Sequence, residues 1–229
     1  MELDATAFAD LGGVAASLGV LLAALGLSST AGLRAYLPLL AVGIAGDANV
    51  VPLQSSFTGL GSPALLLLLA VLAFGEFVAD KVPILDHLSD FVHTAIRPAA
   101  GALIMVGTHN SLSDANMGLA ALVGAGLALL IHGAKATARP AISASTAGIG
   151  NPVVSTVEDI IVIFLLILLL TLPILGLAAL ALLTAFLLRI AQRLTRRLRG
   201  RRSGAGLTER AITRSDRFPA DAPTLPGGR

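Results

Sequence analysis

The sequence predicts an all-α protein that crosses a membrane several times, as a helix bundle with broken or re-entrant helices and one amphipathic helix. Of its 229 residues, 55% are hydrophobic and only 13% are charged, whereas soluble domains carry about 25% charged residues. The mean hydropathy is +0.85. Because one helix needs roughly 20 apolar residues to cross a bilayer, the apolar part of the chain has room for about four to six crossings or partial crossings.

Composition divides the chain into four parts. Residues 1–10 are acidic and contain no Lys or Arg, which is the wrong charge for a signal peptide, so we expect this segment to be retained. Residues 11–188 form the transmembrane helical domain, 189–202 are Arg-rich, and 203–229 form a Gly- and Pro-containing tail that we expect to be disordered. The absence of cysteine excludes disulfides, thiolate metal sites and cysteine nucleophiles.

The first half of the transmembrane domain contains two clear spans with a shorter apolar segment between them. Residues 11–27 are rich in Ala, Gly and Leu, which permits close helix packing. Residues 32–45 are apolar but short and contain Pro38, which indicates a broken or re-entrant helix. A loop over 46–62 leads to the second span, 63–80, whose first residue is a proline suited to a first helical turn.

The next segment, 81–98, has the pattern of an amphipathic helix. Asp86, Asp90, His93 and Arg97 recur every three or four residues and share one face, with apolar residues elsewhere. Residues 99–107 continue as apolar sequence and end in a polar loop.

Two further apolar runs complete the domain. Residues 118–131 form a span that His132, Lys135 and Arg139 extend along one face, and a Ser/Gly-rich break over 140–152 follows. The last run, 160–188, would measure about 43 Å as one helix, which is long for one crossing. Pro173 offers either a kink or a turn between two helices.

The Arg-rich segment predicts the topology and a lipid contact. By the positive-inside rule, this segment places the C-terminus on the cytoplasmic side of the cell membrane. The acidic N-terminus suits the outside. This combination requires an odd number of crossings, and we expect five. Aromatic residues that could stack on bases are scarce, which argues against nucleic-acid binding by this basic segment. The sequence does not decide whether the protein forms a homo-oligomer. The residues expected to contact anionic lipid head groups are Arg189, Arg193, Arg196, Arg197 and Arg199.

Acidic residues gather around the junction of the second span and the amphipathic helix. Glu76 and Asp80 are one turn apart, with Lys81 adjoining. A charge at the centre of a membrane helix costs about 2.5–3.5 kcal/mol on insertion scales, so these residues should pair or face water. Carboxylates and imidazole suit a hydrated divalent cation or a proton relay, and the candidate ligands are Glu76, Asp80, Asp86, Asp90 and His93. The alternative is an interfacial helix whose polar face meets head groups.

Three further groups of polar residues have two interpretations each. His132, Lys135 and Arg139 form either a basic helix end or partners of the acidic residues. Asn151, Glu158 and Asp159 form either an ordinary helix start or part of a discontinuous helix that lines a site. The tetrapeptide Ser-Thr-Ala-Gly occurs at 29–32, before Arg34, and at 145–148, before Asn151, which suggests equivalent breaks in an internal repeat.

Four separated motifs resemble a bacterial family of small multi-pass membrane proteins known as domain of unknown function 4126. They are GLRAYLPLL (32–40), EFVADKVPILDHLSDFVHTAIRPAAGAL (76–103), HGAKATARP (132–140) and GNPVVSTVED (150–159). The resemblance covers about residues 15–188. It implies a membrane location and a helical bundle, and it brings no activity and no catalytic residues.

The sequence therefore predicts a transporter or channel for a small ion, favouring a cation and open to proton coupling. Its expected path residues are Arg34, Glu76, Asp80, Lys81, Asp86, Asp90, His93, Arg97, Lys135, Arg139, Asn151, Glu158 and Asp159. A protein that binds lipid or a partner is one alternative. A metal-dependent intramembrane enzyme is weaker, because no pattern identifies a nucleophile and the zinc motif H-E-x-x-H is absent.

Overall fold

The computed structural model describes residues 3–81, 83–108, 114–146 and 151–190, together with 192, 193 and 196. Side chains are described over 13–81, 92–108, 116–137 and 153–190 and at those last three positions. Every regular element in these ranges is helical, so the predicted fold class is confirmed.

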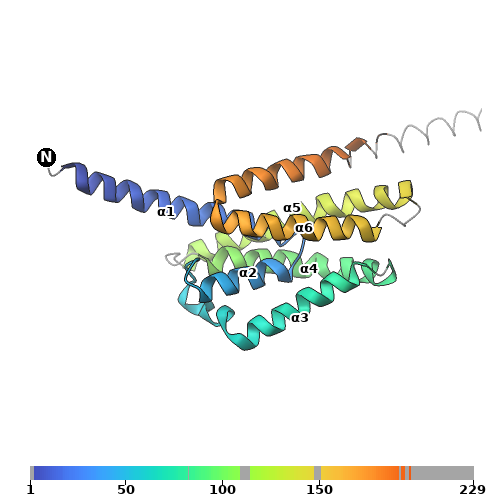
Figure 1. Cartoon of the computed structure of the whole chain (residues 1–229), viewed down its shortest axis with the longest axis horizontal. Coiled ribbons are helices and arrows are strands. Elements are labelled where there is room, and N and C mark those ends of the chain that lie inside the picture. Colours follow the sequence, from blue (N-terminus) through green and yellow to red (C-terminus); the bar gives the residue numbers. More distant parts are fainter. Residues whose placement is uncertain are drawn as a thin grey trace, which may run out of the picture.

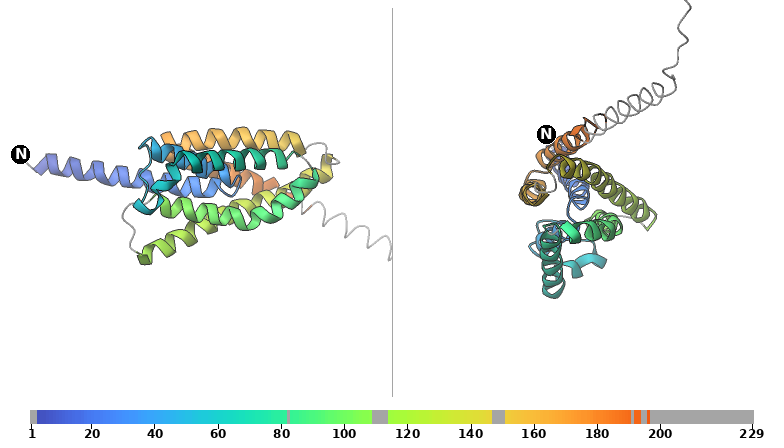
Figure 2. Two further views of the ribbon diagram at one scale, coloured as in Figure 1. Left: turned by 90° about the horizontal axis from the view of Figure 1, so that it is seen from below. Right: turned by 90° about the vertical axis from the view of Figure 1, so that its right-hand side faces the viewer.

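The helices run roughly along one axis and pack side by side (Figures 1 and 2). In chain order they are α1 (Leu3–Thr30), α2 (Tyr36–Asp47), the short 3₁₀ helix η1 (Ser55–Gly61), α3 (Pro63–Ala79), α4 (Pro83–Gly107), α5 (Asp114–Thr146), α6 (Asn151–Thr171) and the C-terminal helix (Pro173–Ile190). Within the described residues, four stretches are long and apolar enough to cross a membrane, and η1 with α3, bent by 64°, makes a fifth when counted as one span.

The break between α1 and α2 agrees with the expected broken or re-entrant segment. α1 ends at Thr30, and α2 has only 12 residues, about 18 Å at 1.5 Å per residue. Pro38 lies in the first turn of α2, where its missing N–H costs nothing. The turn packs closely against α5, where a Cβ at Gly32 would overlap the carbonyl oxygen of Ala128.

Helix α4 joins two segments that the sequence separates by character. It runs without interruption from the amphipathic part, through Pro98, to the apolar end at Gly107. There it packs closely on α5, because a Cβ on Gly101 would lie 2.5 Å from the carbonyl oxygen of Gly124. Such contacts between small residues let membrane helices approach each other closely.

Two helix boundaries bear on the sequence predictions: one corrects a prediction, and the other decides between two alternatives. The break expected over 140–152 is wrong in its first half, because α5 continues through Pro140 to Thr146. A proline removes one backbone hydrogen bond, and the surrounding 33-residue helix tolerates that local loss. The run 160–188, by contrast, forms two helices that turn at Leu172 and Pro173 and lie side by side (Figure 1).

The suggested internal repeat has limited support. Ser29–Thr30 ends α1, and Ser145–Thr146 ends α5, so both copies of the tetrapeptide begin in the last turn of a long helix. The second copy continues into residues outside the described part.

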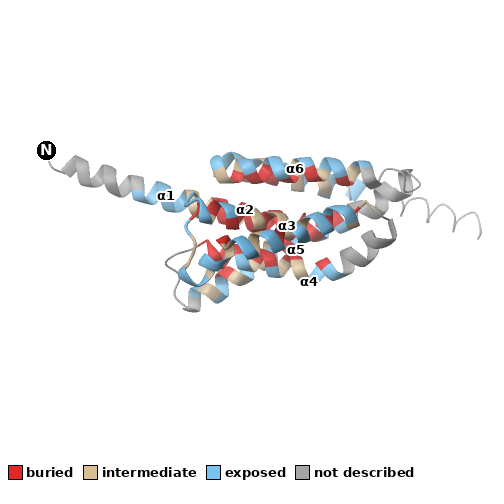
Figure 3. Ribbon diagram, turned by 60° about the horizontal axis from the view of Figure 1, so that its bottom comes forward, coloured by how far each residue is buried: buried red, intermediate tan, exposed pale blue. Residues whose placement is uncertain are grey.

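Burial follows the arrangement of the bundle. Buried residues line the faces that helices turn toward one another, and exposed residues cover the outer faces (Figure 3). Many of the exposed residues are large and apolar, among them Leu67, Phe74, Leu122, Ile163 and Leu182. An apolar exterior of this extent is unusual for a soluble monomer and is what contact with lipid chains requires.

Candidate functional site

Eight charged side chains meet in the interior of the bundle, and we call them the charge network. The cations are Arg34, Lys81, Arg97 and Lys135, and the carboxylates are Glu76, Asp80, Glu158 and Asp159. They come from the α1–α2 turn, the end of α3, α4, α5 and the beginning of α6. Four positive and four negative charges give these eight residues a formal charge of zero.

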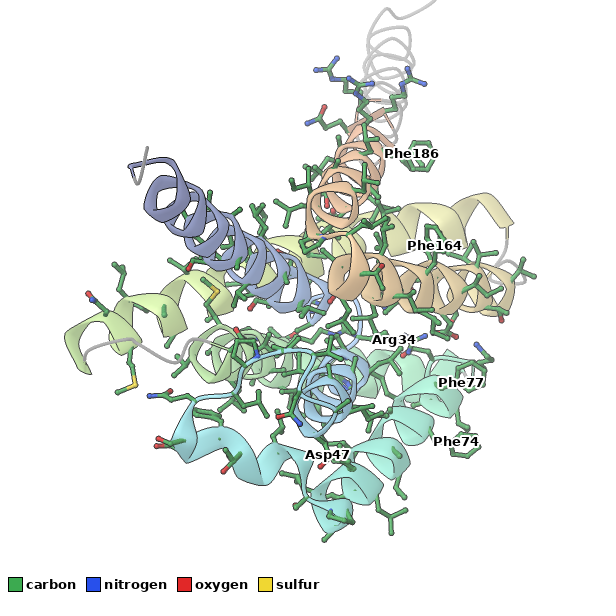
Figure 4. The ribbon with its side chains drawn as sticks, turned by 60° about the vertical axis from the view of Figure 1, so that its left-hand side comes forward. Arg34, Asp47, Phe74, Phe77, Phe164 and Phe186 are labelled. Carbon is green, nitrogen blue, oxygen red and sulfur yellow. The ribbon has the colours of Figure 1, made fainter. Side chains whose placement is uncertain are left out.

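Arg34 is the centre of the network. Its Nη1 lies 2.7 Å from Asp80 Oδ2, and its Nη2 pairs with Asp159 Oδ1. The same guanidinium donates to the carbonyl oxygen of Glu76 and to Ser155 Oγ, each at 3.3 Å. Only 3% of its surface is exposed, and it lies between α6 and the α2–α3 side of the bundle (Figure 4). The planar fork of arginine suits such a bridge between two carboxylates.

Glu76 fixes the broken helix from the neighbouring α3. Its carboxylate accepts hydrogen bonds from the backbone N–H of Ala35, at 3.1 and 3.2 Å, and of Tyr36, at 3.4 Å. These are free donors at the start of α2, where the helix dipole also favours a negative charge. Arg97 Nη2 and His93 Nε2 lie 3.5 and 3.7 Å from Glu76 Oε1.

The two lysines connect α6 to the network. Lys135 Nζ donates to the carbonyl oxygen of Leu33 at 3.0 Å and lies 3.0 Å from Glu158 Oε2 and 3.7 Å from Asp80 Oδ2. It therefore has two carboxylates within reach.

Lys81 Nζ lies 3.0 Å from Asp159 Oδ2 and 4.0 Å from the centre of the Phe77 ring. Its side chain is 26% exposed, the most of the eight network members.

Two histidines, His132 and His93, border the network. The fully buried Arg97 donates through Nη1 to Nδ1 of His132, whose Nε2 lies 3.2 Å from Thr94 Oγ1. Because arginine has no acceptor, Nδ1 must accept, and the ring proton of a neutral His132 is then on Nε2. His93 packs edge-on against the Tyr36 ring, with the ring centres 5.7 Å apart.

The network members on α4 and α5 lie well away from the nearest ends of these helices. α4 extends about 15 Å beyond His93 to Pro83, and α5 extends about 16 Å beyond Lys135 to Thr146. His93, Arg97, His132 and Lys135 are all buried. This burial is opposite to what the interfacial interpretation of α4 and the basic-end interpretation of α5 require for these four side chains.

The structure brings together nine of the residues that the sequence suggested. Eight are the network members, and the ninth is His93. Asp86, Asp90, Arg139 and Asn151 belong to described helices, but their side chains lie outside the described part. Arg189, Arg193 and Arg196 are exposed at the C-terminal end, and Arg197 and Arg199 lie outside the described residues.

Other contributors are hard to detect from sequence alone. Ser155 precedes Asp159 by one helical turn, and Thr94 precedes Arg97 by three residues, so helical spacing from a charged residue could have suggested both. The N–H groups of Ala35 and Tyr36 leave no signal in residue types.

Among the side chains that the structure describes, no three from His, Asp or Glu converge as metal ligands. Each network carboxylate instead faces at least one cation, which would compete with a metal ion for its oxygens. The side chains of the candidate ligands Asp86 and Asp90 lie outside the described part, so the predicted divalent cation stays a prediction.

An apolar exterior, several membrane-length helices and a buried network of ion pairs define a multi-pass helical membrane protein. Residues 21–193 match the family described as "Domain of unknown function (DUF4126)". The match covers most of the chain, so the protein belongs to this family, as the four motifs indicated. No curated protein and no solved structure matches the chain.

Proposed function

We propose that the protein is a transporter or channel for a small cation, with the proton as the favoured ion, and that the charge network is its gate. The observation that carries this proposal is the pairing of four carboxylates with four cations beside the broken helix α1–α2. Three of the carboxylates, Glu76, Asp80 and Asp159, are buried. In the proposed orientation the protein lies in the cell membrane with its C-terminus in the cytoplasm.

The energetics of buried charges support a functional role over a purely structural one. Taking an ion pair out of water costs several kcal/mol per ion, and apolar replacements of similar volume are often at least as stable. Ionisable residues inside membranes accordingly mark ion pathways and proton relays.

The geometry favours a proton over a larger cation. A metal ion needs several carboxylate oxygens at once, whereas the network carboxylates face arginine or lysine. A proton needs one carboxylate or imidazole only, and it releases the cation that the carboxylate held. Lys135, with Glu158 at 3.0 Å and Asp80 at 3.7 Å, can then change its partner within a short distance.

The broken helix supplies an element that such an exchange of partners can move. α2 is anchored at its start by the carboxylate of Glu76, and the turn before it is held by Arg34 and by the contact of Lys135 with Leu33. A proton on Glu76 weakens the anchor, so the charge state of the network is coupled to the position of the re-entrant helix. Short helices that end inside the membrane are common at transporter sites.

The proposal is tested by ion flux in vesicles that contain the purified full-length protein. An internal pH-sensitive dye reports proton movement, and matched gradients of sodium, potassium and magnesium ask for other cations. We expect proton flux above that of protein-free vesicles, and loss of this flux in Glu76→Gln and Asp80→Asn.

Asp47→Asn is the matched control, because it also removes one carboxylate, from an exposed position at the other end of α2. The same assay applied to Asp86→Asn with Asp90→Asn reports on the remaining predicted carboxylates. Absence of flux for every cation, or equal flux in the network variants and the control, would rule the proposal out.

A further inference from the structure

A groove of about 260 Å³ lies between α6 and the C-terminal helix. Its walls are apolar and include Val157 and Ile161 on α6 and Leu183, Phe186 and Leu187 on the C-terminal helix. The side chain of Phe186 projects outward from the C-terminal helix (Figure 4). The groove thus lies between two neighbouring helices, and its lining includes the exposed apolar side chains of Val157 and Phe186.

The inner end of this groove is polar. Lys135 and Glu158, which pair at 3.0 Å, line it together with Leu33 of the α1–α2 turn. A guest in the groove would therefore lie directly against one ion pair of the charge network. It would also exclude water there, and charges attract each other more strongly where water is absent.

Arginines flank the groove along the C-terminal helix. Ile190 lines the groove, and Arg189 precedes it on the same helix. Arg193 and Arg196 follow on the described part of the chain, and all three arginines are exposed. Arginine near a membrane surface attracts anionic lipid head groups.

We propose that the groove binds one acyl chain of an anionic phospholipid from the surrounding bilayer, with the phosphate on Arg189 and Arg193. The apolar walls fit the chain, and the arginines fit the charge of the head group. Lipid binding does not depend on the proposed ion transport. Its consequence for the Lys135–Glu158 pair does rest on that function, because a bound chain would stabilise the closed pairing.

The proposal is tested by adding phospholipids to the purified full-length protein in detergent. Native mass spectrometry then measures lipid adducts, and a thermal melt measures the unfolding temperature. Phosphatidylglycerol and phosphatidylcholine with identical chains separate the head-group contribution from the chain. We expect roughly tenfold tighter binding of phosphatidylglycerol. We also expect Arg189→Gln with Arg193→Gln to abolish this preference.

Two tryptophan variants test the groove itself. Val157→Trp fills it, whereas Ile160→Trp adds the same side chain at an exposed position of α6 outside it. We expect the first variant to lose most of the lipid-induced rise in unfolding temperature and the second to keep it.

Equal behaviour of the two tryptophan variants would overturn the proposal, and so would equal binding of the two lipids. A change of oligomeric state in Val157→Trp without a change in lipid binding would also overturn it, because the groove would then be an interface between copies. None of these readouts involves ion flux, so a failure here is distinct from a failure of the proposed transport.

Discussion

At the scale of single residues, the main finding is that the buried charges are matched. Arg34 bridges Asp80 and Asp159, and Lys135 has Glu158 and Asp80 within reach. Removal of one partner from such a set leaves a buried charge without compensation, which is more costly than removal of both partners.

This asymmetry predicts the stability of Arg34 variants. Arg34→Gln should lower the free energy of unfolding by about 3–5 kcal/mol, because Asp80 and Asp159 lose their shared cation. Addition of Asp159→Asn should cost less than the sum of the single changes, with a coupling of roughly 1–3 kcal/mol. Thermal unfolding in detergent measures the stability of the two single variants and of the double variant relative to the unaltered protein.

The control is again Asp47→Asn, which we expect to change stability by no more than about 0.5 kcal/mol because its side chain is exposed. Strictly additive effects of Arg34→Gln and Asp159→Asn would contradict the bridge.

All eight network residues could be predicted from the sequence, because charged residues are rare in apolar runs and each needs a partner or water. Their pairing could not be. Glu76 and Asp80 have the spacing of a joint cation site, yet Glu76 binds the start of α2 and Asp80 binds Arg34. Those partners are about 40 residues away in the chain, and only the packing of helices brings them together.

At the scale of the helices, small residues determine how closely α4 and α5 approach. Gly101 and Gly124 face each other, and a Cβ on Gly124 would lie 2.6 Å from the Cβ of Met105. The position of α4 in turn determines where His93 and Arg97 meet Glu76.

This contact predicts opposite effects for two neighbouring glycines. Gly124→Ala should destabilise the protein by about 1–3 kcal/mol, because the added methyl group has no space. Gly126→Ala, with nothing within 4 Å of the new Cβ, should be neutral or gain up to about 1 kcal/mol in helix propensity. The unfolding temperatures of the two variants decide, and a larger loss in Gly126→Ala would contradict the packing.

Prolines show why helix boundaries were only partly predictable. Pro38, Pro63 and Pro173 lie at or near helix starts, whereas Pro98 and Pro140 lie inside long helices. A proline in the first turn removes no helix hydrogen bond, whereas Pro98 and Pro140 each remove one from a helix that continues past them. The residue type alone therefore does not distinguish a helix start from a continuation. The packing of the neighbouring helices, which the sequence does not display, determines which one occurs.

At the scale of the whole molecule, the helix order fixes which segments share a side of the membrane. The loop around Pro52 and the turn at Pro173 line the same small pocket. The C-terminal helix then carries the chain to the opposite end of the bundle (Figure 1). We therefore predict that Arg189 and Arg193, at the end of the described chain, lie on the other side of the membrane from these two turns.

The absence of native cysteine makes this topology directly measurable. Single variants Ser56→Cys and Leu172→Cys should react with a membrane-impermeant thiol reagent added outside intact cells. Gln192→Cys should react only after the cells are opened, in agreement with a cytoplasmic C-terminus. Labelling of Ser56→Cys and Leu172→Cys from different sides would contradict the helix order, and outside labelling of Gln192→Cys would reverse the orientation.

The central claim is that the charge network serves ion movement and is more than a structural element. The most direct measurement is proton flux in vesicles containing the double variant Lys135→Gln with Glu158→Gln, which removes one buried ion pair and keeps the network neutral. Because both partners are replaced, the account predicts an unfolding temperature close to that of the unaltered protein. It also predicts flux at the level of protein-free vesicles. A folded double variant with undiminished proton flux would contradict it.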